Sequence, residues 1–180
     1  MMGMNSKRSA ILAALVAAGS LAATGAVALI AAAGGSEIRI DVRSEVAPSS
    51  TSAVGFVDLP GANLVVAVPV GGSRLFTARF TAESQCFGAA ASPAAYCSVR
   101  VIATNTTSGI TTEFNPAAGI DFAFDSNPPG AADDRWEGNA IERSLRLQGG
   151  QYRIRVQRAV TNAATIFRLD DWHFAVETNT

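Results

Sequence analysis

The segment from Ile141 to Val160, IERSLRLQGGQYRIRVQRAV, constrains the fold more than any other part of the sequence. Two runs of alternating residues flank Gly149 and Gly150, and a Gly-Gly pair permits the positive φ angles of a two-residue hairpin turn. The sequence therefore predicts a β-hairpin with one mostly apolar and one polar face, as in a sheet with one side on a core and one in water. The predicted pairs are Leu147 with Tyr152, Leu145 with Ile154, Arg143 with Val156 and Ile141 with Arg158.

Residues 1–33 are typical of a targeting segment. Lys7 and Arg8 precede an uncharged run over residues 9–33, which is the order of a positive n-region and an apolar h-region. The small residues at Ala26-Val27-Ala28 and Ala31-Ala32-Ala33 suit signal-peptidase cleavage. The run is also long enough for an uncleaved membrane anchor, since a helical span needs about 20 residues. Either alternative predicts an export helix and a secreted or cell-envelope protein.

Residues 34–180 are enough for one domain with a sizeable core. This part contains 12 basic and 15 acidic residues, so its formal charge is −3. A charge this small and negative does not favour a nucleic-acid partner. Contact with a membrane is expected only through residues 9–33, if they are not removed.

The two cysteines, Cys86 and Cys97, are expected to form a disulfide. An isolated pair in an exported chain is most simply a structural bridge. A catalytic cysteine needs a nearby base or a C-x-x-C context, and neither accompanies these residues.

Alternating residues recur along the whole of residues 34–180, and no helical period interrupts them. In the last run the inward parity changes at Asp170-Asp171, which predicts a β-bulge. The sequence therefore predicts an all-β, two-sheet antiparallel sandwich, a jelly roll or related Greek key, preceded by the N-terminal apolar export helix. The predicted strands, besides the hairpin, cover residues 37–43, 54–59, 63–70, 73–83, 96–104, 111–114, 120–125 and 166–178.

The pattern G-G-x-Y-x-I-x-V from Gly149 to Val156 is similar to the penultimate strands of jelly-roll modules, including the C1q-like and carbohydrate-binding types. The chain also resembles the exported β-sandwich domains of uncharacterised bacterial surface proteins. The resemblance covers about 30 residues, implies the fold, and assigns no functional residue.

A candidate ligand site centres on Trp136, in the acidic stretch DDRWEGN. An exposed aromatic ring can stack on a sugar, and Asp133, Asp134 and Glu137 can accept hydrogen bonds from its hydroxyl groups. In the alternative, Trp136 covers an open end of the sandwich. Glu137 and Asp134 are also the carboxylates that a glycoside hydrolase would use, an assignment that depends on their separation.

Calcium is the candidate metal, because it takes oxygen ligands from loops. Asp125, Asp133 and Asp134 are the candidate ligands. Their spacing matches no calcium-loop motif, and turns ordinarily contain aspartate. We expect no other cofactor.

The remaining charged groups are expected to be structural. Asp170 and Asp171 are expected to neutralise Arg146 and Arg153, which the predicted hairpin places opposite each other. His173, the single histidine, lies at an outward position of the last strand, with no nucleophile motif beside it.

These observations favour a non-enzymatic exported domain with a structural or interaction role and an unknown protein or glycan partner. The alternative is a carbohydrate-binding module that uses the Trp136 loop, with or without calcium. A homo-oligomer is possible, because Val65 and Ala67 offer a second apolar face.

Overall fold

A computed structural model describes residues 29–31, 38–88, 95–117, 123–127 and 135–179. These residues form one nine-stranded sheet in which all paired strands are antiparallel, so the all-β antiparallel prediction is confirmed. The strands are β1 (Leu29–Ala31), β2 (Ile38–Glu45), β3 (Ser49–Thr51), β4 (Val57–Gly88), β5 (Ala95–Asn105), β6 (Thr111–Glu113), β7 (Asp125–Asn127), β8 (Glu137–Val160) and β9 (Thr165–Asn179).

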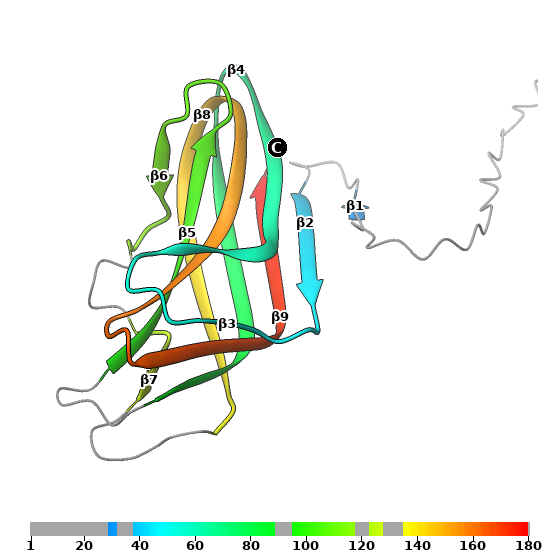
Figure 1. Cartoon of the computed structure of the whole chain (residues 1–180). Helices are drawn as coiled ribbons and strands as arrows, with labels where there is room; N and C mark the ends of the chain where they lie inside the picture. Colours follow the sequence, from blue (N-terminus) through cyan, green and yellow to red (C-terminus); the bar gives the residue numbers. More distant parts are fainter. Residues whose placement is uncertain (1–28, 32–37, 89–94, 118–122, 128–134, 180) are drawn as a thin grey trace, which may run out of the picture.

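The two longest strands, β4 and β8, pair with each other along most of their lengths and fold over together (Figure 1). Residues 63–68 of β4 pair with 150–155 of β8, and residues 73–84 of β4 pair with 137–148. The register shifts between these two segments, where Gly71 has a φ of 76°. The predicted strands at 54–59, 63–70 and 73–83 are therefore parts of one strand.

The predicted hairpin is wrong in its pairing and right in its faces. The chain does reverse at Gly149-Gly150, but each arm pairs with β4 instead of with the other arm. The inward positions of both arms are buried, with Tyr152 partly so, as the alternation predicted. A period of two assigns a residue to a face of a sheet, and it does not identify the strand that lies beside it.

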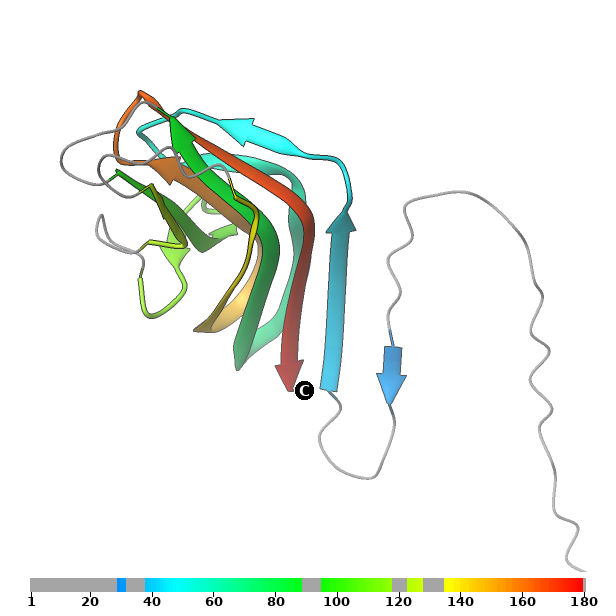
Figure 2. The same cartoon turned by 90° about the horizontal axis from the view of Figure 1, so that it is seen from below.

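The folded ribbon of β4 and β8 divides the sheet into two layers. In the first, here the β9 layer, the order is β2, β9, residues 73–88 of β4 and residues 137–148 of β8. In the second, here the β5 layer, residues 57–70 of β4 are followed by residues 150–160 of β8 and then by β5, which also pairs with β6 and β7. Figure 2 shows β2 beside the end of β9 at one edge.

The core lies between the two layers and is rich in aromatic residues. Phe124, which donates its N–H to the carbonyl of Cys97 in the β5 layer, lies 5.8 Å from Phe80 and 6.2 Å from Phe167, both in the β9 layer. These centroid separations are in the range of favourable aromatic pairs. The largest fully buried side chains include Phe76, Phe80, Phe114, Phe167, Phe174, Ile154 and Leu169.

One side of the sandwich is closed by the chain between β6 and Asn115. β6 pairs with β5, and Asn115 exchanges two backbone hydrogen bonds with Ser144 of β8 in the other layer. Phe114, between them, is completely buried. This segment therefore joins the two layers and covers the core between them.

The predicted disulfide between Cys86 and Cys97 is confirmed, with a Cα–Cα distance of 5.8 Å. Both cysteines are buried, and they lie on β4 in the β9 layer and on β5 in the β5 layer. The bridge therefore ties the two layers covalently.

The predicted bulge at Asp170-Asp171 is also confirmed. The β4–β9 register shifts between Thr81 and Glu83, and Asp171 has a φ of 43°. The bulge lets Leu169 and Trp172, which have opposite parity, both point into the core.

The predicted export helix is not supported. Residues 29–31 form β1, which pairs with β2, and the rest of residues 1–33 lies outside the described residues. The part of the chain that the structure describes contains no helix with the length and hydropathy of a membrane span.

Two expectations about charged side chains at the sheet surface are wrong. Arg146 pairs with Leu75 in the β9 layer and Arg153 with Val65 in the β5 layer, so these arginines do not face each other. No neutralisation by Asp170 and Asp171 is needed. β2 covers residues 38–43 of the strand predicted at 37–43, whose first residue lies outside the described residues, and Ile38 and Ile40 are 45% and 37% exposed.

Candidate functional site

Trp136 lies on the outer face of the β9 layer. It directly precedes Glu137, which pairs with Ser84, so the alternation of strand side chains sets Trp136 beside Gln85 on the face away from the core. Its side chain is 41% exposed. The alternative in which Trp136 covers the open end of the core is therefore not what the structure shows.

Arg168 holds the Trp136 ring. Arg168 pairs with Gln85 across β9 and β4, and its Nη1 donates a hydrogen bond of 3.2 Å to the Oε1 atom of Gln85. The guanidinium carbon lies 5.9 Å from the centroid of Trp136 and 5.3 Å from that of Phe87. Such contacts contribute about 0.5–1 kcal/mol each at exposed sites. Trp136 is thus contacted by Arg168 of β9, which is itself hydrogen-bonded to Gln85 of β4.

Small side chains continue the face from Trp136 along β8. Gly138 and Ala140 occupy the next outward positions, and both are exposed. A Cβ atom built on Gly138 meets no atom within 4 Å, so the surface above this residue is open. Thr81 pairs with Ala140 and extends the same open surface onto β4.

Two carboxylates face each other on this surface. Glu83 pairs with Gly138 on one side and with Asp170 on the other. Like charges directly opposite on neighbouring strands repel each other. Neither carboxylate has an ion-pair partner among the residues that the structure describes.

At its far end the face is bounded by an ion-pair cluster. Arg79 contacts both Glu142 and Glu177, and the hydrogen bond to Glu142 is the largest cause that raises the pKa of Arg79. The surface from Trp136 to this cluster is called the Trp136 face below. It comprises Trp136, which directly precedes β8, Gly138 and Ala140 of β8, Thr81, Glu83 and Gln85 of β4, and Arg168, Asp170 and His173 of β9.

The predicted ligand residues are only partly placed. Glu137 is exposed at the start of β8 and has the parity of Ser84, opposite to that of Trp136, while Asp133 and Asp134 lie outside the described residues. Their separation from Glu137, and with it the glycoside hydrolase assignment, is not tested.

Asp125, the remaining candidate calcium ligand, is engaged in a polar cluster at one end of the core. Its Oδ2 atom accepts a 2.7 Å hydrogen bond from the hydroxyl of buried Ser84, which in turn accepts one from Nδ2 of Asn139. Within the described ranges, no three His, Cys, Asp or Glu side chains are grouped as a metal site would require. Calcium, which would draw on Asp133 and Asp134, stays a prediction.

Buried polar groups near this cluster were not anticipated from the sequence. The amide of Asn127 and the hydroxyl of Thr165 are fully buried, and neither has a hydrogen-bond partner in the described part of the chain. Ser84 follows the predicted strand at 73–83 with the parity of its inward residues, and this was the only signal of a polar end to the core.

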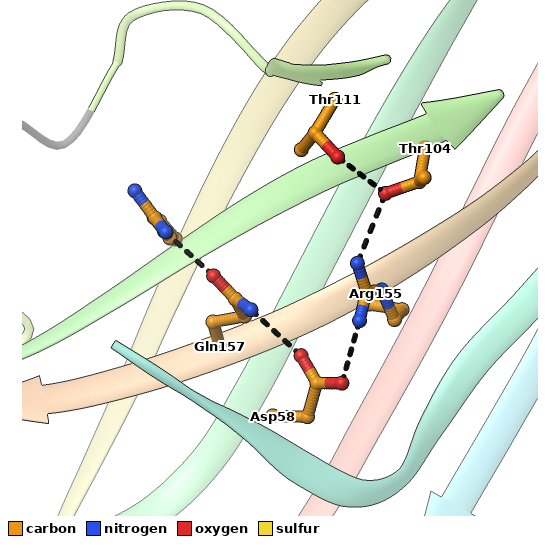
Figure 3. A network of polar contacts seen from close by, with 6 residues as sticks. Asp58, Thr104, Thr111, Arg155 and Gln157 are labelled. Carbon is orange, nitrogen blue, oxygen red and sulfur yellow. Dashed lines mark hydrogen bonds and ion pairs between the residues drawn. The ribbon is translucent and has the colours of Figure 1, made fainter. Parts of the chain in front are cut away.

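The outer face of the β5 layer carries a different arrangement, a continuous polar network (Figure 3). The carboxylate of Asp58 accepts 2.7 Å hydrogen bonds from Arg155 and from Gln157. Arg155 also donates to Thr104, which hydrogen-bonds Thr111. Because these groups satisfy one another across neighbouring strands, the network stabilises the layer and offers few free groups to a ligand.

Comparisons with known proteins found a weak structural similarity. No protein-family model and no curated protein matches the sequence. Among solved structures, the chain is similar to the CBM22-1 xylan-binding domain of Xyn10C from Paenibacillus barcinonensis, with 15% identity and a TM-score of 0.36 over 81% of this chain and 83% of that one. A likeness at this level does not identify what this chain binds.

Proposed function

We propose that the protein is a non-enzymatic, exported binding domain that holds carbohydrate on the Trp136 face. The observation that carries the proposal is an exposed tryptophan whose ring is held by Arg168 beside an open surface at Gly138. A flat, exposed aromatic ring presents an apolar surface to the C–H face of a pyranose, and fixing the ring before binding reduces the entropy lost on binding.

Hydrogen-bonding groups around the ring support a polar ligand. Glu83 and Asp170 lie one row from Trp136 and have free acceptor oxygens among the described contacts. Sugar hydroxyl groups are donors that such carboxylates bind through strong, charge-assisted hydrogen bonds.

A binding role fits the openness of this face better than catalysis. His173 shares a 3.0 Å hydrogen bond through Nδ1 with the hydroxyl of Ser44, and both side chains are exposed. A general base is most effective in a site that excludes water, where electrostatic interactions are strengthened.

The disulfide and the strand pairing support the rest of the proposal. A bridge between Cys86 and Cys97 is stable in an oxidising compartment, which agrees with export. The pairings nest as in a jelly roll: β2 with β9, the two halves of β4 with the two halves of β8, and β5 with β6 and β7. We infer this fold, which many lectin domains share.

The experiment is a glycan array and affinity electrophoresis with wild type, Trp136→Ala and Tyr96→Ala. Tyr96 is a matched control, because it is 40% exposed and lies on β5 in the other layer. We expect a glycan that wild type and Tyr96→Ala bind alike and that Trp136→Ala binds at least about tenfold more weakly, a change of about 1.4 kcal/mol. Binding that survives in Trp136→Ala, or no binding by wild type, contradicts the proposal.

A further inference from the structure

The shape of the Trp136 face limits how a glycan can lie on it. The face is an open sheet surface, and residues 137–140 of β8 pair only with β4 among the described residues, so β8 forms an edge there. Gly138 has open space above it, and Ala140 adds only a methyl group. In the described part of β8 between Trp136 and Ala140, the outward positions therefore carry no side chain that would enclose the end of a sugar chain.

A ligand that covers this surface from end to end is longer than one sugar residue. Trp136 and Ala140 are four positions apart, which corresponds to about 13 Å at roughly 3.3 Å per residue of strand. A ring stacked on Trp136 covers one end of this distance. Neighbouring units of the same chain are needed to reach Thr81 and Ala140 at the other end.

The charge of the face favours an uncharged ligand. The Glu83 and Asp170 carboxylates face each other, and Arg168, a cation on the same face, is directed to Gln85 and the Trp136 ring. Repulsion between Glu83 and Asp170 is relieved by hydroxyl donors placed between them. A ligand carboxylate or sulfate in the same place adds repulsion.

We infer that the Trp136 face binds the side of an extended, uncharged polysaccharide. One pyranose stacks on Trp136, and the following units cross Gly138 within reach of Glu83 and Asp170. This inference rests on the proposed function and adds the class of ligand and the direction in which it lies.

The first test compares an uncharged polysaccharide, its short oligosaccharides and a polyuronate as ligands of the full chain. We expect the polymer to bind at least about tenfold more tightly than a disaccharide, and the polyuronate to bind at least about tenfold more weakly than the neutral polymer in low salt. Added salt is expected to reduce the second difference, because salt screens exposed charges. A disaccharide that binds as tightly as the polymer overturns side-on binding.

Two variants test whether the polysaccharide crosses Gly138 and whether the Glu83 and Asp170 carboxylates disfavour a charged ligand. Gly138→Leu places a side chain on the open surface, starting from a Cβ that meets no atom within 4 Å, so its unfolding midpoint should stay unchanged while neutral polymer binds at least about fivefold more weakly. The double variant Glu83→Gln with Asp170→Asn should gain binding of the polyuronate. Unchanged polymer binding by Gly138→Leu, or a polyuronate preferred by wild type, overturns the inference. In both cases a loss of binding in Trp136→Ala still supports the proposed function, so the two failures can be told apart.

Discussion

Gly149 is the residue at which the fold-over of β4 and β8 can be tested most directly. A Cβ atom at this position would lie 2.8 Å from the carbonyl oxygen of Pro69, 2.9 Å from Cα of Val70 and 3.1 Å from the backbone nitrogen of Gly71. All three are backbone atoms, which cannot rotate away as the end of a side chain can. Gly149→Ala must therefore separate the two folded strands at the corner.

The expected cost follows from overpacking. Inserting a methyl group into a filled site costs about 1–3 kcal/mol. For a domain of this size, 1 kcal/mol lowers the midpoint of thermal unfolding by roughly 3 °C, so we expect a decrease of about 3–10 °C. The matched control is Gly138→Ala, whose Cβ meets no atom within 4 Å and which should leave the midpoint unchanged or slightly higher.

A second substitution at the same residue separates the fold-over from a simple hairpin. Asn-Gly is a favoured sequence for a two-residue hairpin turn, so Gly149→Asn would be tolerated there. In the structure any Cβ at residue 149 meets the backbone of β4, and Gly149→Asn should cost at least as much as Gly149→Ala. Differential scanning calorimetry of the four proteins measures the result, and an unchanged midpoint for Gly149→Asn would refute the reasoning.

Three further predictions concern Arg168, Arg158 and Asp125. Arg168→Met should raise the quenching of tryptophan fluorescence by acrylamide, because Trp136 loses its ring contact while the other tryptophan is only 2% exposed; unchanged quenching contradicts the positioning role. Arg158 is buried, donates three hydrogen bonds to β3 and has its pKa lowered to about 10 by desolvation. Its folded pKa is below its ordinary value, so its contribution to the free energy of unfolding is least favourable below pH 10 and becomes more favourable as the pH rises above 10. Urea unfolding of wild type and Arg158→Met should show a difference that changes with this sign between pH 9 and 11 (about one unit either side of the folded pKa), and a constant difference contradicts it. Calcium should raise the thermal midpoint of wild type and not that of Asp125→Asn, and equal midpoints with and without chelator remove the metal.

Alternation predicted which residues are buried far better than which strands are neighbours. Leu145, Leu147 and Ile154 were assigned to the apolar face of the predicted hairpin from the period of two, and all three are buried. The reversal at Gly149 was also predicted, but its arms pair with a strand that begins some 80 residues earlier in the chain. Such pairing depends on the packing of the complete core, and local patterns do not contain it.

The candidate site shows the same division. Trp136 could be identified from the sequence as a large aromatic residue without a strand to explain it. Gln85 and Arg168, which complete its surroundings, lie on β4 and β9, and only the three-strand register brings them to Trp136. The bulge that adjusts the parity of β9 was predictable, because two aromatic-rich runs of opposite parity must share one core.

The strand register also determines how the Trp136 face is displayed. Ile38, at the start of β2, pairs with Asn179, at the end of β9, so the described domain has its entry and exit side by side (Figure 1). Arg168 and Trp136 lie toward the opposite end of β9 and β8. A domain tethered through either terminus would therefore hold its tryptophan outward, away from the point of attachment, with the length of the sandwich serving as a spacer.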